Sequence, residues 1–172
     1  YDNSHTFGKN SVGVMVVADK EGLSPKNYRK FNIRYNLKEK EISNVDDYYM
    51  MEEVLTRRLG KIEKKDELLI PDVIIIDGGR GQYNSVLKIL KKYELDSINL
   101  LSVSKGPERN AGREIIHLEN QNLNLKPNDS LLNFIQRLRD EAHRFAITAH
   151  RSRRSKSSIK SVFDDIKGIG PK

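Results

Sequence analysis

The sequence predicts an α/β domain built on one mixed sheet of five or six strands, with helices packed against the sheet. Short β-branched runs alternate along the 172 residues with segments whose apolar side chains recur every three or four positions, the pattern of strands alternating with helices. Within the segment 71–77, residues 73–76 are apolar at every position, as in a central strand covered on both faces. Hydrophobic residues make up 37% of the chain and charged residues 32%, which is enough to fill a core beneath a charged surface.

Strands and then a helix are predicted for the first half of the chain. Residues 1–5 read as the end of a strand, and the β-branched run 12–17 as a second strand. Residues 28–33 alternate with a period of two, so we expect them to pair antiparallel with residues 12–17 after a turn. From residue 46 to 59, apolar side chains at spacings of 3, 4 and 4 indicate a helix with one buried face. These side chains are Tyr48, Met51, Leu55 and Leu59.

Buried strands and two helices are predicted for the second half. A glycine-rich turn after residue 77 leads into a helix that carries Val86 and Leu90 on its apolar face. Residues 100–103 are expected to form a buried strand and residues 114–118 an edge strand. The last apolar stripe, with spacings of 4, 3, 4, 3 and 4, predicts a helix of about five turns or more. Its members are Leu131, Ile135, Leu138, Ala142, Phe145 and Ala149.

Positive charge gathers at one end of the sequence. Residues 137–172 contain ten lysines and arginines against four acids, so they carry +6 of the formal net charge of +7. Such a concentration is typical of a surface that binds a polyanion, and nucleic acid is the expected partner. A solvated helix face is the ordinary alternative. We interpret the Ser/Arg/Lys segment 151–158 as a basic linker.

Several classes of protein are excluded by composition. The chain has no cysteine, which rules out disulfides, thiolate zinc sites and a cysteine nucleophile, so any metal is held by oxygen or imidazole. No run approaches the roughly 20 apolar residues of a membrane span, and the start lacks the layout of a signal peptide. We therefore expect a soluble, cytoplasmic protein. Because Tyr1 is not a methionine and residues 168–172 read as the middle of a motif, we expect a fragment of a longer chain.

Two carboxylates are the first candidates for chemistry. Asp77 ends a buried strand and precedes Gly78 and Gly79, at the strand end where open α/β sheets place their sites. A helix N-cap or turn aspartate is the ordinary alternative. Asp2 also lies at a strand, although a turn aspartate is again the commoner explanation. If the two carboxylates meet, they stay ionised only with a cation between them, and oxygen ligands point to Mg²⁺ or Mn²⁺.

Three further residues are candidates, each with an ordinary alternative. His143 borders the apolar stripe of the last helix and could ligate a metal or move a proton, unless it is a hydrogen-bonded structural histidine. Asp47 precedes the first helix, where capping is the ordinary role and a place in a metal shell the functional one. Lys105 follows a buried strand and could clamp a phosphate, although an exposed loop lysine is the default. Residues 166–170 have the glycine pattern of a helix-hairpin-helix.

An ordered set of short motifs runs over essentially the whole chain. The motifs are YDNSHT at residues 1–6, DDY at 46–48, IDGGRGQ at 76–82, KG at 105–106, AG at 111–112, the segment 137–147, HR at 150–151 and GIGPK at 168–172. Each motif alone is ambiguous, but the set in this order resembles the C-terminal half of UvrC, the nuclease subunit of the bacterial UvrABC excision system. Arg80 and Ser104 depart from the family pattern, which usually has lysine and alanine there.

The resemblance implies an RNase H-like endonuclease domain over residues 1–153 that uses Mg²⁺ or Mn²⁺ to make the 5′ incision at a DNA lesion. It also implies that residues 154–172 are a basic linker and the start of a truncated helix-hairpin-helix domain. The implied partners are double-stranded DNA with a lesion and UvrB, with UvrA acting indirectly, and no membrane is involved.

Residue roles are likewise implied by position in the family motifs. Asp2, Asp77 and His143 take the places of the catalytic triad and are the expected metal ligands. The supporting residues are Asp47, Lys105 and Arg139, and the expected DNA contacts are Arg80, Arg144, Arg151, Arg153, Arg154 and Lys156. A rival from another class remains open: a non-catalytic DNA-binding or partner-docking module with the same fold. Composition supports it equally, because a basic segment binds phosphate with or without a metal.

Overall fold

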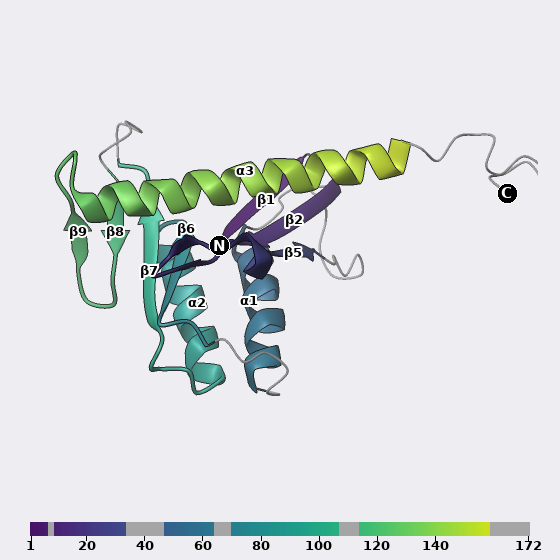
Figure 1. The fold of residues 1–172 in the computed structure, drawn as a ribbon. Coiled ribbons are helices and arrows are strands. Elements are labelled where there is room, and N and C mark those ends of the chain that lie inside the picture. Colours follow the sequence, from purple (N-terminus) through teal and green to yellow (C-terminus); the bar gives the residue numbers. More distant parts are fainter. Residues whose placement is uncertain (7–8, 34–46, 64–69, 107–113, 159–172) are drawn as a thin grey trace, which may run out of the picture.

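The structure, a computed structural model, describes residues 1–6, 9–33, 47–63, 70–106 and 114–158 (Figure 1). Its strands are β1 (Asp2–Thr6), β2 (Lys9–Met15), β3 (Ala18–Asp19), β4 (Gly22–Leu23), β5 (Arg29–Asn32), β6 (Val73–Asp77), β7 (Asn99–Ser104), β8 (Ile115–His117) and β9 (Asn122–Asn124). Its helices are the 3₁₀ helix η1 (Pro25–Asn27) and the α-helices α1 (Asp47–Glu63), α2 (Arg80–Lys92) and α3 (Ser130–Ser158). Parallel and antiparallel strands are combined with flanking helices, which confirms the predicted α/β class.

The N-terminal strands form an antiparallel ladder in the order β1-β2-β5. Val12 pairs with Asn32 and Met15 with Arg29, so the predicted pairing of residues 12–17 with residues 28–33 is confirmed. The expected turn between them contains the small β3–β4 hairpin and η1.

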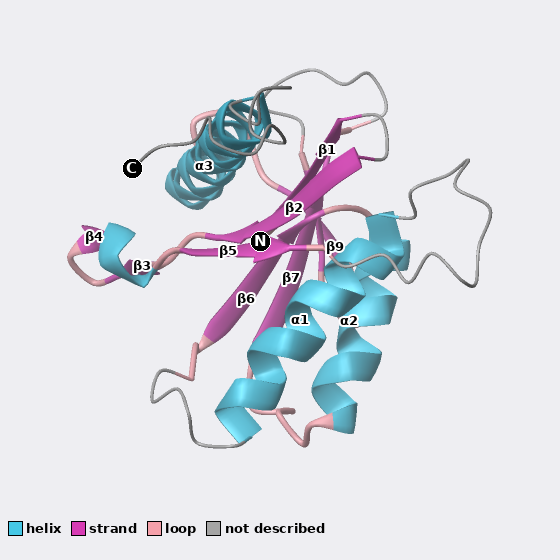
Figure 2. Ribbon diagram, turned by 90° about the vertical axis from the view of Figure 1, so that its right-hand side faces the viewer, coloured by secondary structure: helices cyan, strands magenta, loops and turns pink. Residues whose placement is uncertain are grey.

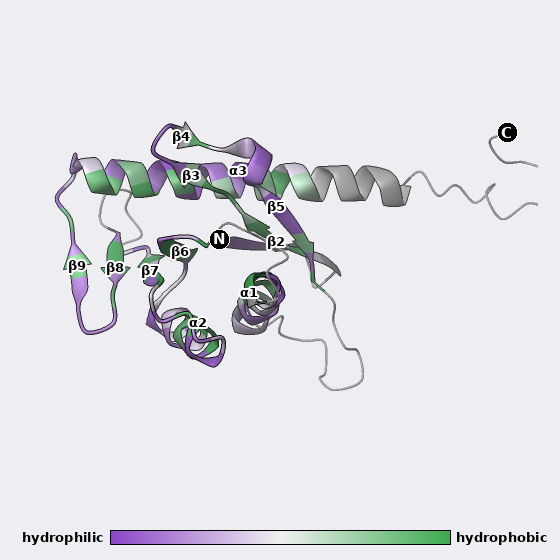
Figure 3. Ribbon diagram, turned by 60° about the horizontal axis from the view of Figure 1, so that its bottom comes forward, coloured by the Kyte–Doolittle hydropathy of each residue, from purple (hydrophilic) through white to green (hydrophobic). Residues whose placement is uncertain are grey.

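A second ladder runs in the order β6-β7-β8-β9, with β6 and β7 parallel and the others antiparallel. The prediction that residues 114–118 form an edge strand is wrong, because β9 pairs with β8 on its outer side. Leu118 donates its backbone N–H to the Gln121 carbonyl at 2.9 Å and closes the tight turn that returns the chain. Figure 3 shows hydrophobic β8 beside the largely hydrophilic β9, and polar residues suit a sheet edge.

The two ladders meet between β1 and β6. Asp77 donates its backbone N–H to the Tyr1 carbonyl at 3.0 Å, and the Tyr1 nitrogen donates to the Ile75 carbonyl at 2.7 Å. The strands therefore lie in one layer in the order β5-β2-β1-β6-β7-β8-β9. This layer has one strand more than the upper end of the predicted range, because no pattern in the sequence indicated β9.

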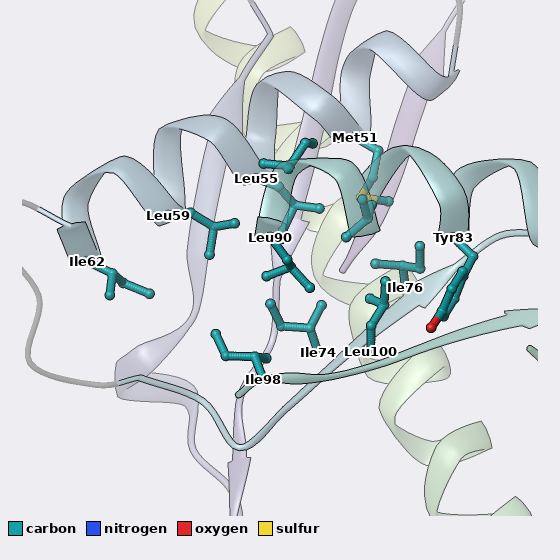
Figure 4. Packing of buried hydrophobic residues seen from close by; sticks show 12 residues of the cluster. Met51, Leu55, Leu59, Ile62, Ile74, Ile76, Tyr83, Leu90, Ile98 and Leu100 are labelled. Carbon is teal, nitrogen blue, oxygen red and sulfur yellow. The ribbon is translucent and has the colours of Figure 1, made fainter. Parts of the chain in front are cut away.

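Helices α1 and α2 lie together on one side of the layer, and α3 crosses the other side (Figure 2). Buried side chains from α1, α2 and the β6–β7 pair form the main core, shown in Figure 4. Under α3, Val12 and Val14 of β2 contact the small side chains of Ala142 and Ala146. These alanines allow the helix backbone to lie close to the sheet.

The predicted apolar stripes are confirmed in their centres and shifted at their ends. Met51, Leu55 and Leu59 are fully buried, whereas Tyr48 is 47% exposed in the first turn of α1. In α3, Leu131 is exposed and its neighbour Leu132 is completely buried instead.

The C-terminal boundary of α3 also differs from the sequence prediction. Residues 151–158 are helical in the structure, as the continuation of α3, and their interpretation as a linker stays a prediction. Lysine and arginine are good helix formers, and the segment has no glycine or proline to end the helix. The side chains from residue 150 onward and all of residues 159–172 lie outside the described part, so the division at residue 153 stays a prediction. In the part that is described, no helix has the length and apolar character needed to cross a membrane.

Candidate active site

Asp2 and Asp77 come together where the two ladders meet. Asp2 is the first residue of β1 and Asp77 the last residue of β6, and the Asp77 backbone bonds to Tyr1, the neighbour of Asp2. The strand ends thus deliver the two acids from sequence positions 75 residues apart to one place, as the sequence analysis expected.

A polar pocket of about 520 Å³ opens at this place. It is lined by Asp2, Asn3, Asp47, Asp77, Gly78, Gln82, Val103, Ser104, Lys105 and Arg139. The candidates Asp2, Asp77, Asp47, Lys105 and Arg139 therefore share one cavity, although they come from separate segments of the chain. Its wall contains three acids, which can bind a cation, and two basic residues, which can bind a phosphate.

Asp2 is held in an environment that disfavours its negative charge. Its side chain is 11% exposed, and burial raises the pKa of its carboxyl group, with the Asp77 carboxylate as the next cause. His143 acts in the opposite direction. Among the described residues, no group donates a hydrogen bond to the buried atom Asp2 Oδ2. This buried oxygen has no hydrogen-bond donor, and a second carboxylate lies nearby. Such an oxygen is suited to bind a cation that prefers oxygen ligands.

His143 reaches the acids from the solvent side. Its Nδ1 lies 3.6 Å from Asp2 Oδ2, and its side chain is 70% exposed. Because α3 crosses β1 and β2 on small residues, the turn that carries His143 passes beside the start of β1. His143 therefore does not sit deep in the core, as expected, and its side chain is more exposed than a position at the border of the core implies.

The three residues do not form a ready-made metal cage. Within the described ranges, no group of three or more histidine, aspartate or glutamate side chains is arranged so that it could hold a metal ion. The assignment of Asp2, Asp77 and His143 as ligands remains a prediction. A site with two carboxylates fits Mg²⁺, because this ion keeps several water ligands and needs only one or two carboxylates from the protein.

Asp77 is held by Arg139, which in turn contacts Glu114. Arg139 Nε donates to Asp77 Oδ1 at 3.0 Å, and its Nη1 donates to Glu114 Oε1 at 3.4 Å. Gln136 Nε2 contacts both carboxylate oxygens of Glu114, at 3.2 and 3.1 Å. Glu114 and Gln136 escaped the sequence analysis. The one available signal was that Gln136, Arg139 and His143 share a face of the last helix at spacings of three and four.

Ser104, which also lines the pocket, belongs to a second network that the sequence analysis missed. His117 Nε2 lies 2.9 Å from Ser104 Oγ, and His117 Nδ1 lies 2.8 Å from Asn122 Oδ1. Because an amide oxygen only accepts, Nδ1 carries the proton, and in the neutral imidazole Nε2 accepts from the serine hydroxyl. The pocket wall at Ser104 is therefore tied to the buried His117 and to the β8–β9 hairpin.

Arg80, expected to contact DNA, has an internal role in the structure. Its guanidinium donates to the Leu118 carbonyl, to the Gln121 carbonyl at 3.2 Å and to Asn122 Oδ1 at 2.6 Å. It thereby fastens the start of α2 to the hairpin. A contact between Arg80 and DNA stays an untested prediction, and its donors are already engaged.

The remaining predicted residues lie at the pocket wall, elsewhere on α3 or outside the described part of the chain. Asp47 is the first residue of α1, and its carbonyl accepts from Asn3 Nδ2 at 3.3 Å. Lys105 is exposed at the pocket wall. Arg144 is exposed and paired with Glu141 through two contacts of 2.7 Å. The side chains of Arg151, Arg153, Arg154 and Lys156 are not described, so their predicted contacts with DNA are not addressed.

Comparison with known proteins gives one consistent result. Residues 1–147 match the family model described as the UvrC RNAse H endonuclease domain. A UvrABC system protein C from Paramagnetospirillum magneticum is 48% identical over 177 aligned residues, covering 100% of this chain and 28% of the relative. Its counterpart from Zymomonas mobilis is also 48% identical, covering 99% of this chain and 26% of the relative. The chain thus spans roughly a quarter of the length of these curated relatives.

Proposed function

The chain belongs to the UvrC RNase H endonuclease domain family, and from this premise we propose that it hydrolyses a DNA phosphodiester on the 5′ side of a lesion in nucleotide excision repair. It acts in the cytoplasm with UvrA and UvrB and depends on Mg²⁺ or Mn²⁺. The observation that carries the proposal is the meeting of Asp2 and Asp77 in a pocket that His143 borders.

Asp2 and Asp77 would hold the divalent ion. The chemistry that such an ion supplies when bound is the polarisation of a phosphoryl oxygen and the neutralisation of charge in the transition state. Asp2 contributes a carboxylate oxygen with no other donor among the described residues, and Asp77 contributes the oxygen that Arg139 leaves available. Asp47 lies across the same pocket, where its charge adds to the attraction for the ion.

His143 would move the proton of the attacking water. The side chain of His143 lies beside Asp2, with Nδ1 3.6 Å from Asp2 Oδ2, and a neutral imidazole has one nitrogen that can accept a proton from water. The same carboxylate stabilises the imidazolium that forms. Exposure of the side chain gives it access to a strand of DNA that lies over the pocket.

Lys105 would hold the phosphate next to the scissile bond. Its ammonium group is exposed at the pocket wall, where it can contact the backbone without reading a base. Backbone contacts suit an enzyme that recognises many lesions, because they carry no sequence information.

A DNA-binding or docking module without hydrolysis is the second candidate. The observation that favours it is that the described residues hold no preassembled group of three metal-binding side chains. The two candidates differ in one measurable property, which is cutting that depends on the carboxylates.

The test is an incision assay on a duplex with one defined lesion, in the presence of UvrA, UvrB and the protein that contains this chain. Asp77→Asn keeps the size of the side chain and removes its charge, so 5′ incision should fall by at least about a hundredfold. Asp96→Asn is the matched control, because Asp96 is an exposed turn residue that does not line the pocket. Incision by Asp77→Asn at the rate of Asp96→Asn would overturn the proposal and leave the binding module.

A further inference from the structure

Arg139 lies between two carboxylates from separate segments, Asp77 at the end of β6 and Glu114 just before β8. It contacts Asp77 Oδ1 at 3.0 Å on one side and Glu114 Oε1 at 3.4 Å on the other. The side chain of Arg139 is 15% exposed and that of Glu114 only 7%, whereas that of Asp77 is 38% exposed. The guanidinium is therefore anchored on its buried side by Glu114 and contacts Asp77 on the side of the pocket.

Glu114 is itself held in place. Gln136, one turn before Arg139 on α3, directs its amide nitrogen at both oxygens of the Glu114 carboxylate. Glu114 also immediately precedes β8, which is paired along its length with β7. Strand β8 and helix α3 together hold Glu114 in position, and Glu114 in turn holds Arg139.

This arrangement bears directly on the affinity of the pocket for a cation. Arg139 occupies one oxygen of Asp77 and brings a positive charge to the carboxylate that a divalent ion has to share. In a partly buried site such a charge is poorly screened, so it opposes the binding of a second cation. Glu114 offers the guanidinium another anionic partner and thereby reduces this opposition.

We propose that Glu114 is a positioning residue that acts through Arg139 and sets the affinity of the Asp2–Asp77 pair for a divalent cation. Arg139 is the internal counter-cation of Asp77 while no metal is bound, and Glu114 retains the guanidinium when Asp77 takes a metal. The proposal rests on the proposed function, because it concerns the same acids.

The test is Mn²⁺ binding to the chain, measured by electron paramagnetic resonance of the free ion without DNA and without any cleavage. Arg139→Met removes the competing charge, so Mn²⁺ should bind about tenfold more tightly. Glu114→Gln leaves Arg139 with Asp77 as its one anionic partner in the network of Asp77, Glu114, Gln136 and Arg139. Mn²⁺ should then bind about three- to tenfold more weakly. In the Arg139→Met background, Glu114→Gln should change the affinity by less than about twofold, since its effect passes through the arginine.

Two controls separate this mechanism from simpler ones. Arg137→Met removes an equal charge from an exposed arginine on the same helix that does not line the pocket, and it should change the affinity by less than about twofold. Thermal unfolding of each variant shows whether it is folded. If Arg139→Met does not fold, Arg139→Gln keeps a polar hydrogen-bond donor without the charge and should also tighten Mn²⁺ binding.

Failure of the inference is distinguishable from failure of the proposed function. Asp2→Asn defines the binding that belongs to the pocket. If the wild-type chain binds Mn²⁺ no better than Asp2→Asn, the metal site itself is lost, and the present inference with it. If the wild type binds in the pocket but Arg139→Met binds equally or more weakly, only the role of Glu114 and Arg139 is overturned. A Glu114→Gln effect that persists undiminished in the Arg139→Met background also overturns it.

Discussion

The fold places the carboxyl group of Asp2 in an environment that disfavours its ionised form. Burial, and then the neighbouring Asp77 carboxylate, raise its pKa above the ordinary value of 3.8. A raised pKa in the folded state means that Asp2 stabilises the fold fully below the ordinary pKa of the unfolded chain. That contribution is lost as the pH rises through the higher folded value.

Asp2→Asn should therefore increase the free energy of unfolding at pH 7, and the gain should disappear near pH 3. The amide has the size of the carboxyl group and no charge to lose, so it is insensitive to the pH window in which Asp2 ionises. Urea denaturation of both proteins at intervals between pH 3 and pH 8 measures the difference. A gain that is constant over this range would show that the charge of Asp2 is not its cause.

Arg80 illustrates how an arginine near a site can serve the fold. Its contacts with two carbonyls of the turn and with Asn122 Oδ1 join α2 to the β8–β9 hairpin. Arg80→Ala leaves these acceptors without their donor and should lower the free energy of unfolding by about 2 kcal/mol, the usual range for hydrogen bonds to a charged group. Urea denaturation gives the loss, and amide hydrogen exchange should locate it in residues 118–124.

The matched control for this prediction is Lys88→Ala. Lys88 is an exposed residue of the same helix, so its truncation should change stability by less than about 0.5 kcal/mol. Equal effects of the two substitutions would contradict the structural role of Arg80.

At the level of elements, β2 and α1 approach each other so closely that only glycine fits between them. A Cβ built on Gly13 would lie 2.3 Å from Val54 Cγ2, and Val54 is completely buried. Gly13→Ala should therefore cost about 1–3 kcal/mol of stability through overpacking.

Adding Val54→Ala should recover part of that loss, because it removes the methyl groups that the new Cβ meets. The coupling between the two substitutions, measured by a double-mutant cycle in urea, should be favourable by about 1 kcal/mol. Gly79→Ala is the control, since a Cβ there meets nothing within 4 Å. Additive effects of Gly13→Ala and Val54→Ala would refute the close approach of the two elements.

Hydrophobic periodicity was sufficient to predict the three long helices, because each buries one continuous face, and an uninterrupted apolar run was sufficient to predict β6, which is covered on both faces. It could not predict β9, whose residues Asn122, Leu123 and Asn124 offer too short an alternation. The meeting of Asp2 and Asp77 was expected from the resemblance to the family, whereas the strand pattern alone left a turn or cap aspartate as the ordinary alternative at each position. The role of Glu114 could not be predicted from the sequence. Its contact with Arg139 depends on how α3 lies over β8, and no local sequence pattern determines that arrangement. The internal contacts of Arg80 could not be predicted for the same reason, since its partners lie 38 to 42 residues away.

The molecule as a whole carries its positive charge at one end. Four of the basic residues, Arg151, Arg153, Arg154 and Lys156, lie in the last turns of α3. Replacing all four with alanine should weaken binding to duplex DNA of any sequence, because phosphate contacts release counterions without reading bases.

Fluorescence anisotropy at several salt concentrations tests this prediction. If all four residues contact phosphates, the slope of log K against log salt should fall by roughly 3 to 4 in magnitude. An unchanged slope would place the DNA-binding surface elsewhere. A loss confined to one DNA sequence would indicate base recognition instead.

The join between β1 and β6 has a mechanical consequence. Asp2 belongs to one hydrogen-bonded ladder and Asp77 to the other, and the two backbone bonds of Tyr1 bridge them. A force that separates the ladders would act first on the gap between the two carboxylates. An ion bound between the two carboxylates would connect the two ladders, so that binding the ion would also stiffen the sheet.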